Sequence, residues 1–558
     1  MNSSSLSGNR HLQLRRIGRQ TSRSALLLGM FVASSWAAAG GGASAFDNGD
    51  GADIPPWTPD ILAAIDEYVP APSFNNGRFS LDHFAAANSL DQQGLVTAQL
   101  ANGDMVIAGL VPDGVAGGFC GDGTTLCSIG LVRYNTAGQR VPWSNPGDNG
   151  RYFDNYSVFP SIASPLPRYQ YLRDVKVRGN RIDVLVDQPD RNIPGSPLGN
   201  RDVSVVTFLD NGQQWRNISV FGQGSFGAPG DNEDFYGAQM VQTDSAAVTI
   251  AATAYDSVGS YVAITRMIII DNDLHRDTDW GVPYAGTSST RLYRYLGPSD
   301  SCAVPINSRC NVTANYVARP VASTSAYVYV QGSVQNAGND WNAMTLKLHS
   351  VNGTRPASFG GDGWVVTQFD QANSSNRDIG AGLYVYQDDV YLAAQVARKC
   401  HDGIGVAKLN GATGAYNATF GSGGKIVFGG QGNAMFCIAQ GIGTDYPFAI
   451  SATGGRIGIV GYESFRDLNN SVHVDPMLAV VNAVDGTLID FNTHPVKRAD
   501  GSRYGDAVLF GIYGGPLPTS PFTVSGNGRD ASAGNTLSYV AGKLVPISSD
   551  RIFGTGFE

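Results

Sequence analysis

Residues 420–427 read FGSGGKIV, and residues 359–366 read FGGDGWVV. Both phrases open with phenylalanine, place three glycines within the next four positions and end in β-branched residues. A phrase that returns after about 60 residues indicates an internal repeat. Because glycine tolerates positive φ, we expect each phrase to be a loop between two repeat units, with its phenylalanine inserted between adjacent sheets.

The phrase belongs to a longer cycle of a polar stretch, an alternating apolar strand, a second strand rich in β-branched residues, and a turn. In the clearest unit, residues 390–396 and 404–409 read as the strands and residues 410–414 (NGATG) as the turn. Small residues at 392–394 suit a first strand that is crowded near an axis. Similar strand pairs occur at 104–109 and 129–134, 181–186 and 203–208, 248–252 and 261–270, 327–332 and 344–348, and 456–461 and 477–481.

About seven units result, with openings near Phe74, Asp148, Phe221, Trp280, Phe359, Phe420 and Arg503. Several short strands per unit at this period predict an all-β chain folded as a β-propeller of about seven blades, with six to eight as the range. The propeller is expected to span residues 74–548, and its last unit, from Tyr504 onward, to need an N-terminal strand for completion. Independent β-sandwich domains are the alternative, but they require Pro-rich linkers, and none follows residue 72.

The N-terminal 45 residues have the pattern of a secretory signal peptide. Five arginines precede an apolar run at 25–39 and an Ala-Ser-Ala sequence that ends at Ala45. An uncleaved membrane anchor is the alternative, but the run is short of the roughly 20 residues needed to span a bilayer. Residues 46–73 are predicted to be a linker with a short helix at 61–68, and residues 549–558 a C-terminal tail.

The charge balance disfavours two classes of partner. The chain has 38 basic and 47 acidic residues, and cleavage of the signal peptide would remove five of the bases. An acidic mature protein is a poor ligand for nucleic acid or anionic membranes. We expect a monomer without a transmembrane span, whose unknown ligand is a protein or a carbohydrate.

Six cysteines in an exported chain favour disulfides. Cys120 lies close to Cys127, and Cys302 lies close to Cys310, which predicts two local bridges. The pairing of Cys400 with Cys437 would then cross neighbouring repeats. A metal site is the alternative, but no C-x-x-C spacing is present.

The cycle of F-G-x-G-G-K-I-V, a G-R-I-x-I-x-G strand and an A-x-x-x-N-x-x-G turn resembles the delta-60 repeat of secreted bacterial proteins. The match is close at residues 410–427 and 455–461, looser elsewhere in 74–547, and departs from the pattern in units three and four. The tail at 551–558 is similar to the ends of other exported Gram-negative bacterial proteins. The resemblance implies a propeller-like architecture and export to the periplasm, the cell surface or the medium. It brings no catalytic residues.

Few residue patterns suggest chemistry. Asp271, Asp273, Asp277 and Asp279, with His275 among them, are a weak calcium candidate, and a solvated turn is the alternative. Residues 407–414 (AKLNGATG) are similar to the turns of quinoprotein propellers, but position 416 is tyrosine where those enzymes carry tryptophan. After the signal peptide the histidines are His83, His275, His349, His401, His473 and His494.

No nucleophile-elbow, zinc-protease or phosphate-loop motif is present in the sequence. Catalytic and cofactor-binding residues therefore stay unassigned, and no cofactor is predicted apart from the weak calcium candidate. The sequence favours a non-catalytic binding or surface-interaction protein. The alternative is a propeller enzyme, quinoprotein-like or hydrolytic, with its site at the central channel.

Overall fold

The computed structural model describes the following residues: 67–82, 93–112, 127–143, 151–153, 171–189, 201–211, 214–221, 234–244, 246–256, 259–283, 291–295, 311–320, 326–336, 340–369, 377–397, 402–429, 444–466, 472–515, 520–530 and 536–547. The chain divides into two units, Met1–Ala39 and Gly40–Glu558, and every described residue lies in the second. The described residues include no helix that is long and apolar enough to cross a membrane.

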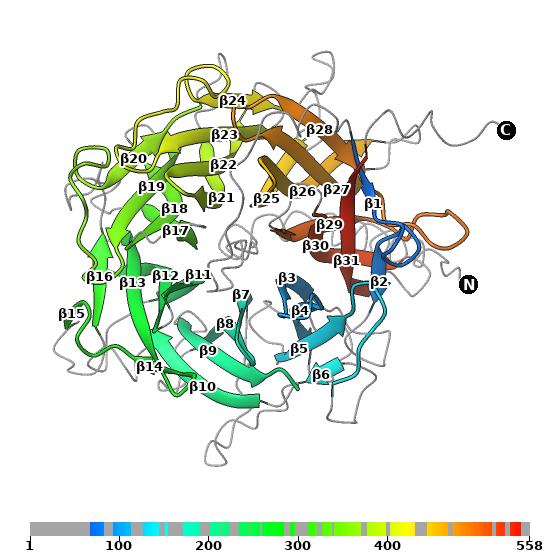
Figure 1. Cartoon of the computed structure of the whole chain (residues 1–558), viewed down its shortest axis with the longest axis horizontal. Coiled ribbons are helices and arrows are strands. Elements are labelled where there is room, and N and C mark those ends of the chain that lie inside the picture. The colour runs from blue at the N-terminus through cyan, green and yellow to red at the C-terminus, as the bar shows by residue number, and fades with distance from the viewer. Residues whose placement is uncertain are drawn as a thin grey trace, which may run out of the picture. The chain divides into compact units, whose positions relative to one another are not determined.

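Seven antiparallel sheets are arranged as the blades of a propeller, which confirms the predicted fold class (Figure 1). Blades 1, 2, 4, 5 and 6 each contain four strands. Blade 1 contains β3 (Gln93–Gln99), β4 (Met105–Pro112), β5 (Cys127–Tyr134) and β6 (Arg151–Phe153), and blade 2 contains β7 (Tyr171–Arg178), β8 (Arg181–Pro189), β9 (Arg201–Leu209) and β10 (Gln214–Phe221). Blade 4 contains β17 (Val312–Ala318), β18 (Tyr327–Gln335), β19 (Trp341–His349) and β20 (Trp364–Thr367), and blade 5 contains β21 (Asp378–Tyr386), β22 (Asp389–Ala397), β23 (Asp402–Asn410) and β24 (Lys425–Phe428). Blade 6 contains β25 (Thr444–Thr453), β26 (Arg456–Arg466), β27 (Val472–Asn482) and β28 (Leu488–Thr493).

Blades 3 and 7 are larger. Blade 3 contains β11 (Asp234–Asp244), β12 (Ala247–Asp256), β13 (Gly259–Ile270), β14 (Asp273–Arg276), β15 (Val282–Pro283) and β16 (Arg291–Tyr295). Blade 7 contains β29 (Ala507–Gly514), β30 (Phe522–Asp530), β31 (Thr536–Ile547), β1 (Glu67–Pro70) and β2 (Ser80–Asp82).

The innermost strand of every blade carries a β-bulge at its pairing with the second strand. The bulges fall at Gly94/Val96, Leu172/Asp174, Gly237/Gln239, Ala314/Tyr316, Gly380/Gly382, Pro447/Ala449 and Leu509/Gly511. A bulge bends a strand and turns one extra side chain out of the ladder. The strand containing residues 392–394, expected nearest the axis, is the second strand of blade 5.

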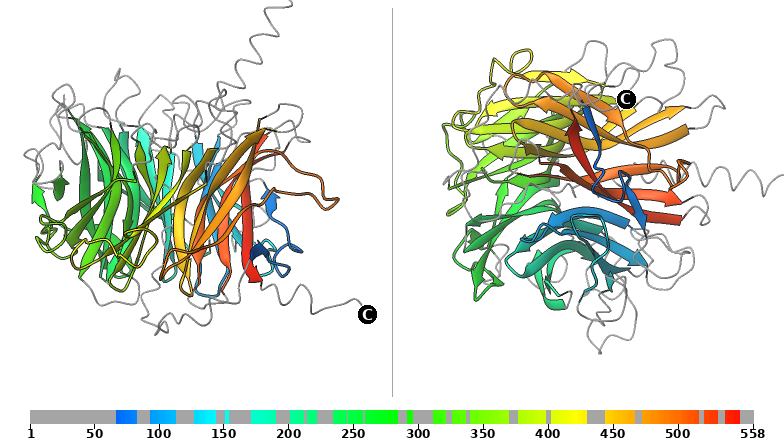
Figure 2. Two further views of the ribbon diagram at one scale, coloured as in Figure 1. Left: turned by 90° about the horizontal axis from the view of Figure 1, so that it is seen from above. Right: turned by 45° about the vertical axis from the view of Figure 1, so that its right-hand side comes forward.

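The ring closes between the two ends of the chain. Strand β1 pairs with β31 in an antiparallel register that sets Tyr68 opposite Pro546, and β2 pairs with the same strand. The N-terminal segment thus completes blade 7 at its outer edge, as the sequence analysis expected (Figure 2). Of the helix predicted at 61–68, residues 61–66 lie outside the described part of the chain, and Glu67 and Tyr68 lie in a strand because they pair with β31. The amide of Tyr68 also donates to Asp490 and its hydroxyl accepts from Arg456, both in blade 6.

The repeated glycine phrases lie between the third and fourth strands of one blade, so their predicted position between blades is wrong. Their role between adjacent sheets is nevertheless confirmed. Phe359 and Phe420 are fully buried, and each packs with side chains of the following blade. Gly360 donates its amide to the carbonyl of Thr413 at 2.9 Å, and Gly421 donates to Asp485 at 2.7 Å. Both acceptors belong to turns of the next blade.

A second set of contacts repeats at the same two seams between blades. Lys347 donates to the carbonyl of Gly411 at 2.6 Å, and Lys408 donates to the carbonyl of Ala483 at 3.1 Å. The hydroxyl of Tyr329 donates to Gly411 as well. In blade 3, which lacks the glycine phrase, Trp280 donates its indole N–H to Ser350 of blade 4 at 3.2 Å. In each of these three seams, a donor of one blade therefore binds a turn carbonyl of the next blade.

Candidate functional site

Blade 2 contains buried charges on its axial strand β7 and on the adjacent strand β8, and no sequence motif pointed to them. Arg173, the bulged residue of β7, binds Asp187 of β8 with an Nε to Oδ2 distance of 2.8 Å, and both side chains are completely buried. The other oxygen of Asp187 accepts the amide of Gly237 in blade 3 at 2.9 Å. The guanidinium also lies 5.0 Å from the ring centre of Tyr171. This ion pair therefore joins two blades.

Asp174 is the neighbouring axial carboxyl group. Its oxygens accept the amides of Val175 at 2.9 Å and of Met240, in blade 3, at 3.0 Å. Burial raises the pKa of Asp174 to about 6, against the opposing effect of Lys176, whose ammonium lies 3.4 Å away. A pKa near neutrality is also what a general base needs, but both oxygens of this group already hold backbone amides.

Aromatic side chains fill another part of the axial lining. Tyr316 of blade 4 is buried, and its hydroxyl donates to the carbonyl of Phe448 in blade 6. The ring of Phe448 packs on Phe510 of blade 7 with 4.8 Å between ring centres. Burial raises the pKa of Tyr316, so the phenol stays protonated and acts as a donor. The described residues of blades 4, 6 and 7 thus meet through packed rings.

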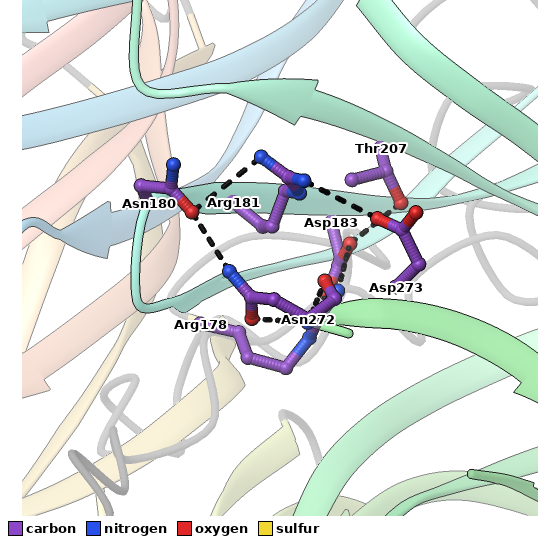
Figure 3. A network of polar contacts seen from close by, with 7 residues as sticks. All are labelled: Arg178, Asn180, Arg181, Asp183, Thr207, Asn272 and Asp273. Atoms are coloured by element: carbon purple, nitrogen blue, oxygen red, sulfur yellow. Dashed lines mark hydrogen bonds and ion pairs between the residues drawn. The ribbon is translucent and has the colours of Figure 1, made fainter. Parts of the chain in front are cut away.

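At the opposite end of β7, blades 2 and 3 are joined by a polar network (Figure 3). Arg178 binds Asp183 with an Nε to Oδ2 distance of 3.0 Å, and its Nη1 donates to the carbonyl of Asn272 at 2.6 Å. Arg181 reaches Asp273 at 3.3 Å. Two further contacts complete the network: Thr207 donates to Asp183, and Asn272 donates to Asn180.

The predicted calcium loop is part of this seam. Asp271 and Asn272 form a two-residue hairpin turn with φ of 52° and 63°, a geometry for which Asp and Asn are favoured. Asp273 is paired with Arg181, and Asp277 with Arg266 at 3.4 Å. Within the described residues, no group of three or more His, Cys, Asp or Glu side chains is arranged to hold a metal. The structure thus gives two of the four acids, Asp273 and Asp277, arginine partners.

Two carboxyl groups of blade 6 stand directly opposite each other, Glu463 on β26 and Asp475 on β27. Burial raises the pKa of Glu463, and the charge of Asp475 raises it further. Burial also raises the pKa of Asp475, against the opposing effect of Arg503, which binds it. Asp506 accepts the amide of the neighbouring residue Val474 at 3.1 Å. Carboxyl pairs with perturbed pKa values mark functional sites often enough to make this one a candidate. No motif in the sequence pointed to it.

The histidines do not converge within the described chain. His275 belongs to blade 3, His349 packs against Tyr327 in blade 4 with tilted rings, and His473 lies 3.7 Å from Asp506. His494 packs against Phe79 beside the closing strands, and burial lowers its pKa to about 4. His83 and His401 lie outside the described residues.

Cys127, at the start of β5, is disulfide-bonded. The other cysteines, Cys120, Cys302, Cys310, Cys400 and Cys437, lie outside the described residues, so the three pairings stay predictions.

The quinoprotein-like turn has a defined structural use. The carbonyl of Gly411 accepts from Lys347 and Tyr329, and the hydroxyl of Tyr416 donates to Thr367 at 3.2 Å. The turn and the tyrosine that follows it therefore contact blade 4.

The comparisons with known proteins agree on no activity. No protein-family model matches the chain, and no curated protein matches it. Solved structures with a similar fold include the polysaccharide lyase Uly1, at 9% identity and a TM-score of 0.43 over 87% of this chain and 100% of that one. A PL25 ulvan lyase has 10% identity and a TM-score of 0.40 over 84% and 95% of the two chains. The Hadza microbial sialidase Hz136 has 9% identity and a TM-score of 0.39 over 83% and 66%. Likenesses at this level carry no argument about activity.

Proposed function

We propose that this chain is an exported delta-60 repeat β-propeller that acts as a non-catalytic binding or surface-interaction protein, with a protein or a carbohydrate as its ligand. The observation that carries the proposal is the use of the axial charged groups. Arg173 binds Asp187, and Asp187 and Asp174 accept backbone amides of the next blade. A catalytic acid or base must be able to exchange protons with a substrate. These charged groups instead hold two blades together, so they serve the structure of the propeller and not proton exchange with a substrate.

Binding is tested with the mature protein, residues 46–558, against immobilised polysaccharides and glycoproteins by biolayer interferometry. Each polymer is also incubated with the protein, and its chain length is followed by size-exclusion chromatography. We expect retention of at least one polymer with no change in chain length. Depolymerisation, or the absence of binding across the whole panel, would contradict the proposal.

Export is tested separately, by expressing the full chain in a Gram-negative host and sequencing the N-terminus of the protein recovered outside the cytoplasm. The proposal requires an N-terminus at Phe46. A protein retained in the cytoplasm with residues 1–45 intact would count against export.

A second candidate function, hydrolysis of a glycosidic bond, is favoured by one observation. Glu463 and Asp475 form a carboxyl pair in which burial raises both pKa values, and such pairs supply the acid and base of glycosidases. If the polymer assay shows cleavage, Glu463→Gln should abolish it while leaving polymer retention unchanged. Cleavage that survives Glu463→Gln would remove this pair from consideration.

A further inference from the structure

The hairpin between β18 and β19 of blade 4 gathers three oxygen-bearing side chains. Asn336 donates its amide nitrogen to Asp340 Oδ2 at 2.7 Å, and Asn342 donates to the same oxygen at 3.1 Å. The backbone amide of Asn336 donates to the carbonyl of Asp340 at 2.8 Å and closes the hairpin. The three side-chain heads therefore converge on one point.

Each of these side chains also has an oxygen without a partner. The Oδ1 atoms of Asn336, Asp340 and Asn342 are inaccessible to solvent and form no hydrogen bond in the described structure. Asp340 is 8% exposed and Asn342 is 1% exposed, so bulk solvent does not reach them. A buried acceptor without a partner is destabilising, and three in one place call for an explanation.

The charge balance of Asp340 differs from that of two other buried carboxylates, Asp187 and Asp183. Asp187 is paired with Arg173, and Asp183 with Arg178. The bonds that Asp340 makes come from two neutral amides and no cation. Arg377, whose backbone bridges to Trp341 beside it, directs its guanidinium to Asp402 at 2.8 Å. A buried carboxylate is ordinarily paired or bound to a metal ion.

We propose that Asn336, Asp340 and Asn342 bind a calcium ion. In the structure the amide nitrogens of Asn336 and Asn342 face the carboxylate. A half-turn of each amide brings its unpartnered oxygen to that side instead, so that the two donors become acceptors for the ion. Carboxylate and amide oxygens are the ligands that Ca²⁺ prefers, and its irregular coordination tolerates three protein ligands with water in the remaining places. One carboxylate in the set suits the weak sites of extracellular modules, with Kd roughly 10⁻⁴–10⁻³ M.

Trp341, between two of the ligands, provides the readout. The mature protein is freed of metal with a chelator and titrated with Tb³⁺ while tryptophan is excited, and the emission is then displaced with Ca²⁺. Calorimetry with Ca²⁺ and with Mg²⁺ gives the affinities, and thermal unfolding with and without Ca²⁺ gives an independent measure. We expect one site, terbium emission that Ca²⁺ displaces, and a Tm that rises with Ca²⁺.

The variant Asp340→Asn removes the charge at constant shape and should weaken calcium affinity at least tenfold. Asp402→Asn is the matched control, because that carboxylate already has Arg377 as its partner. If Asp340→Asn does not fold, Asn342→Ala takes its place and should also weaken binding. The proposal is overturned if the wild-type protein shows no calcium-dependent signal, if the affinity is unchanged in these variants, or if Asp402→Asn loses the signal equally.

Discussion

The seam between blades 2 and 3 and the seams from blade 4 to blade 6 perform one task with different chemistry. In the later seams, Lys347 and Lys408 donate to turn carbonyls of the next blade, and Phe359 and Phe420 fill the space between the sheets. In the earlier seam, Arg178 donates to the corresponding turn at Asn272.

The acceptor is the same at these seams: a backbone carbonyl in the turn after the third strand. What the fold requires from the preceding blade is therefore a donor that reaches this carbonyl. The phrase F-G-x-G-G is one solution, and an arginine network is another. The ionic seam relies on buried charges that lose their partner when one residue changes, whereas the aromatic seams spread their stability over many contacts.

The largest effect is expected from Arg173→Met, which leaves Asp187 as an unpaired buried charge. We expect the free energy of unfolding to fall by about 3–5 kcal/mol, measured by urea unfolding at neutral pH. The double variant Arg173→Met with Asp187→Leu should recover most of the loss. Equal losses in the single and double variants would mean that pairing is not what stabilises this seam.

The corresponding changes in the aromatic seams are Phe359→Ala and Phe420→Ala. Each removes a fully buried ring, and each should cost about 3 kcal/mol. The exposed Val366→Ala serves as the control and should change stability by less than about 0.5 kcal/mol. Because the two phrases occupy equivalent places, clearly unequal losses would argue against a shared role.

The sequence predicted the all-β class, the blade number and the insertion of the phenylalanines, because the second and third strands follow regular alternation. It missed the innermost strands, since a bulge in each interrupts the period of two and the bulged residues include Arg173 and Asn315. It also missed the buried ion pairs. Asp183 and Asp187 lie on one face of β8 and look like an exposed strand face, because their partners Arg178 and Arg173 lie on the innermost strand that the sequence did not reveal.

The pH dependence of stability tests the raised pKa of Asp174, the axial carboxyl group of blade 2. Because burial raises the pKa of Asp174 to about 6, the native state holds a proton that the unfolded state releases, and this group destabilises the protein as pH rises from about 4 to 7. The free energy of unfolding of Asp174→Asn should therefore rise relative to that of wild type by roughly 2–3 kcal/mol between pH 4 and pH 7. Urea unfolding at a series of pH values measures the difference. A difference independent of pH would show that the carboxyl group titrates normally.

The smallest effects are expected from Lys347→Met and Lys408→Met. Each removes a charged donor to a turn carbonyl but keeps most of the apolar stem, so a loss of about 1–2 kcal/mol is expected by urea unfolding. Tyr329 still donates to Gly411 after the first change, which limits the loss there. Losses as large as those of the phenylalanine variants would make the lysines, and not the rings, the main element of these seams.

The most direct test of whether the repeated phrase holds adjacent blades together is hydrogen–deuterium exchange of the native protein, followed by mass spectrometry. Gly360 and Gly421 lie in turns, yet their amides are bound to the next blade. We expect peptides covering residues 359–364 and 420–425 to exchange slowly, like the strands beside them, and faster in Phe359→Ala and Phe420→Ala respectively. Exchange as rapid as in the exposed turn at residues 499–502 would contradict this role of the phrase.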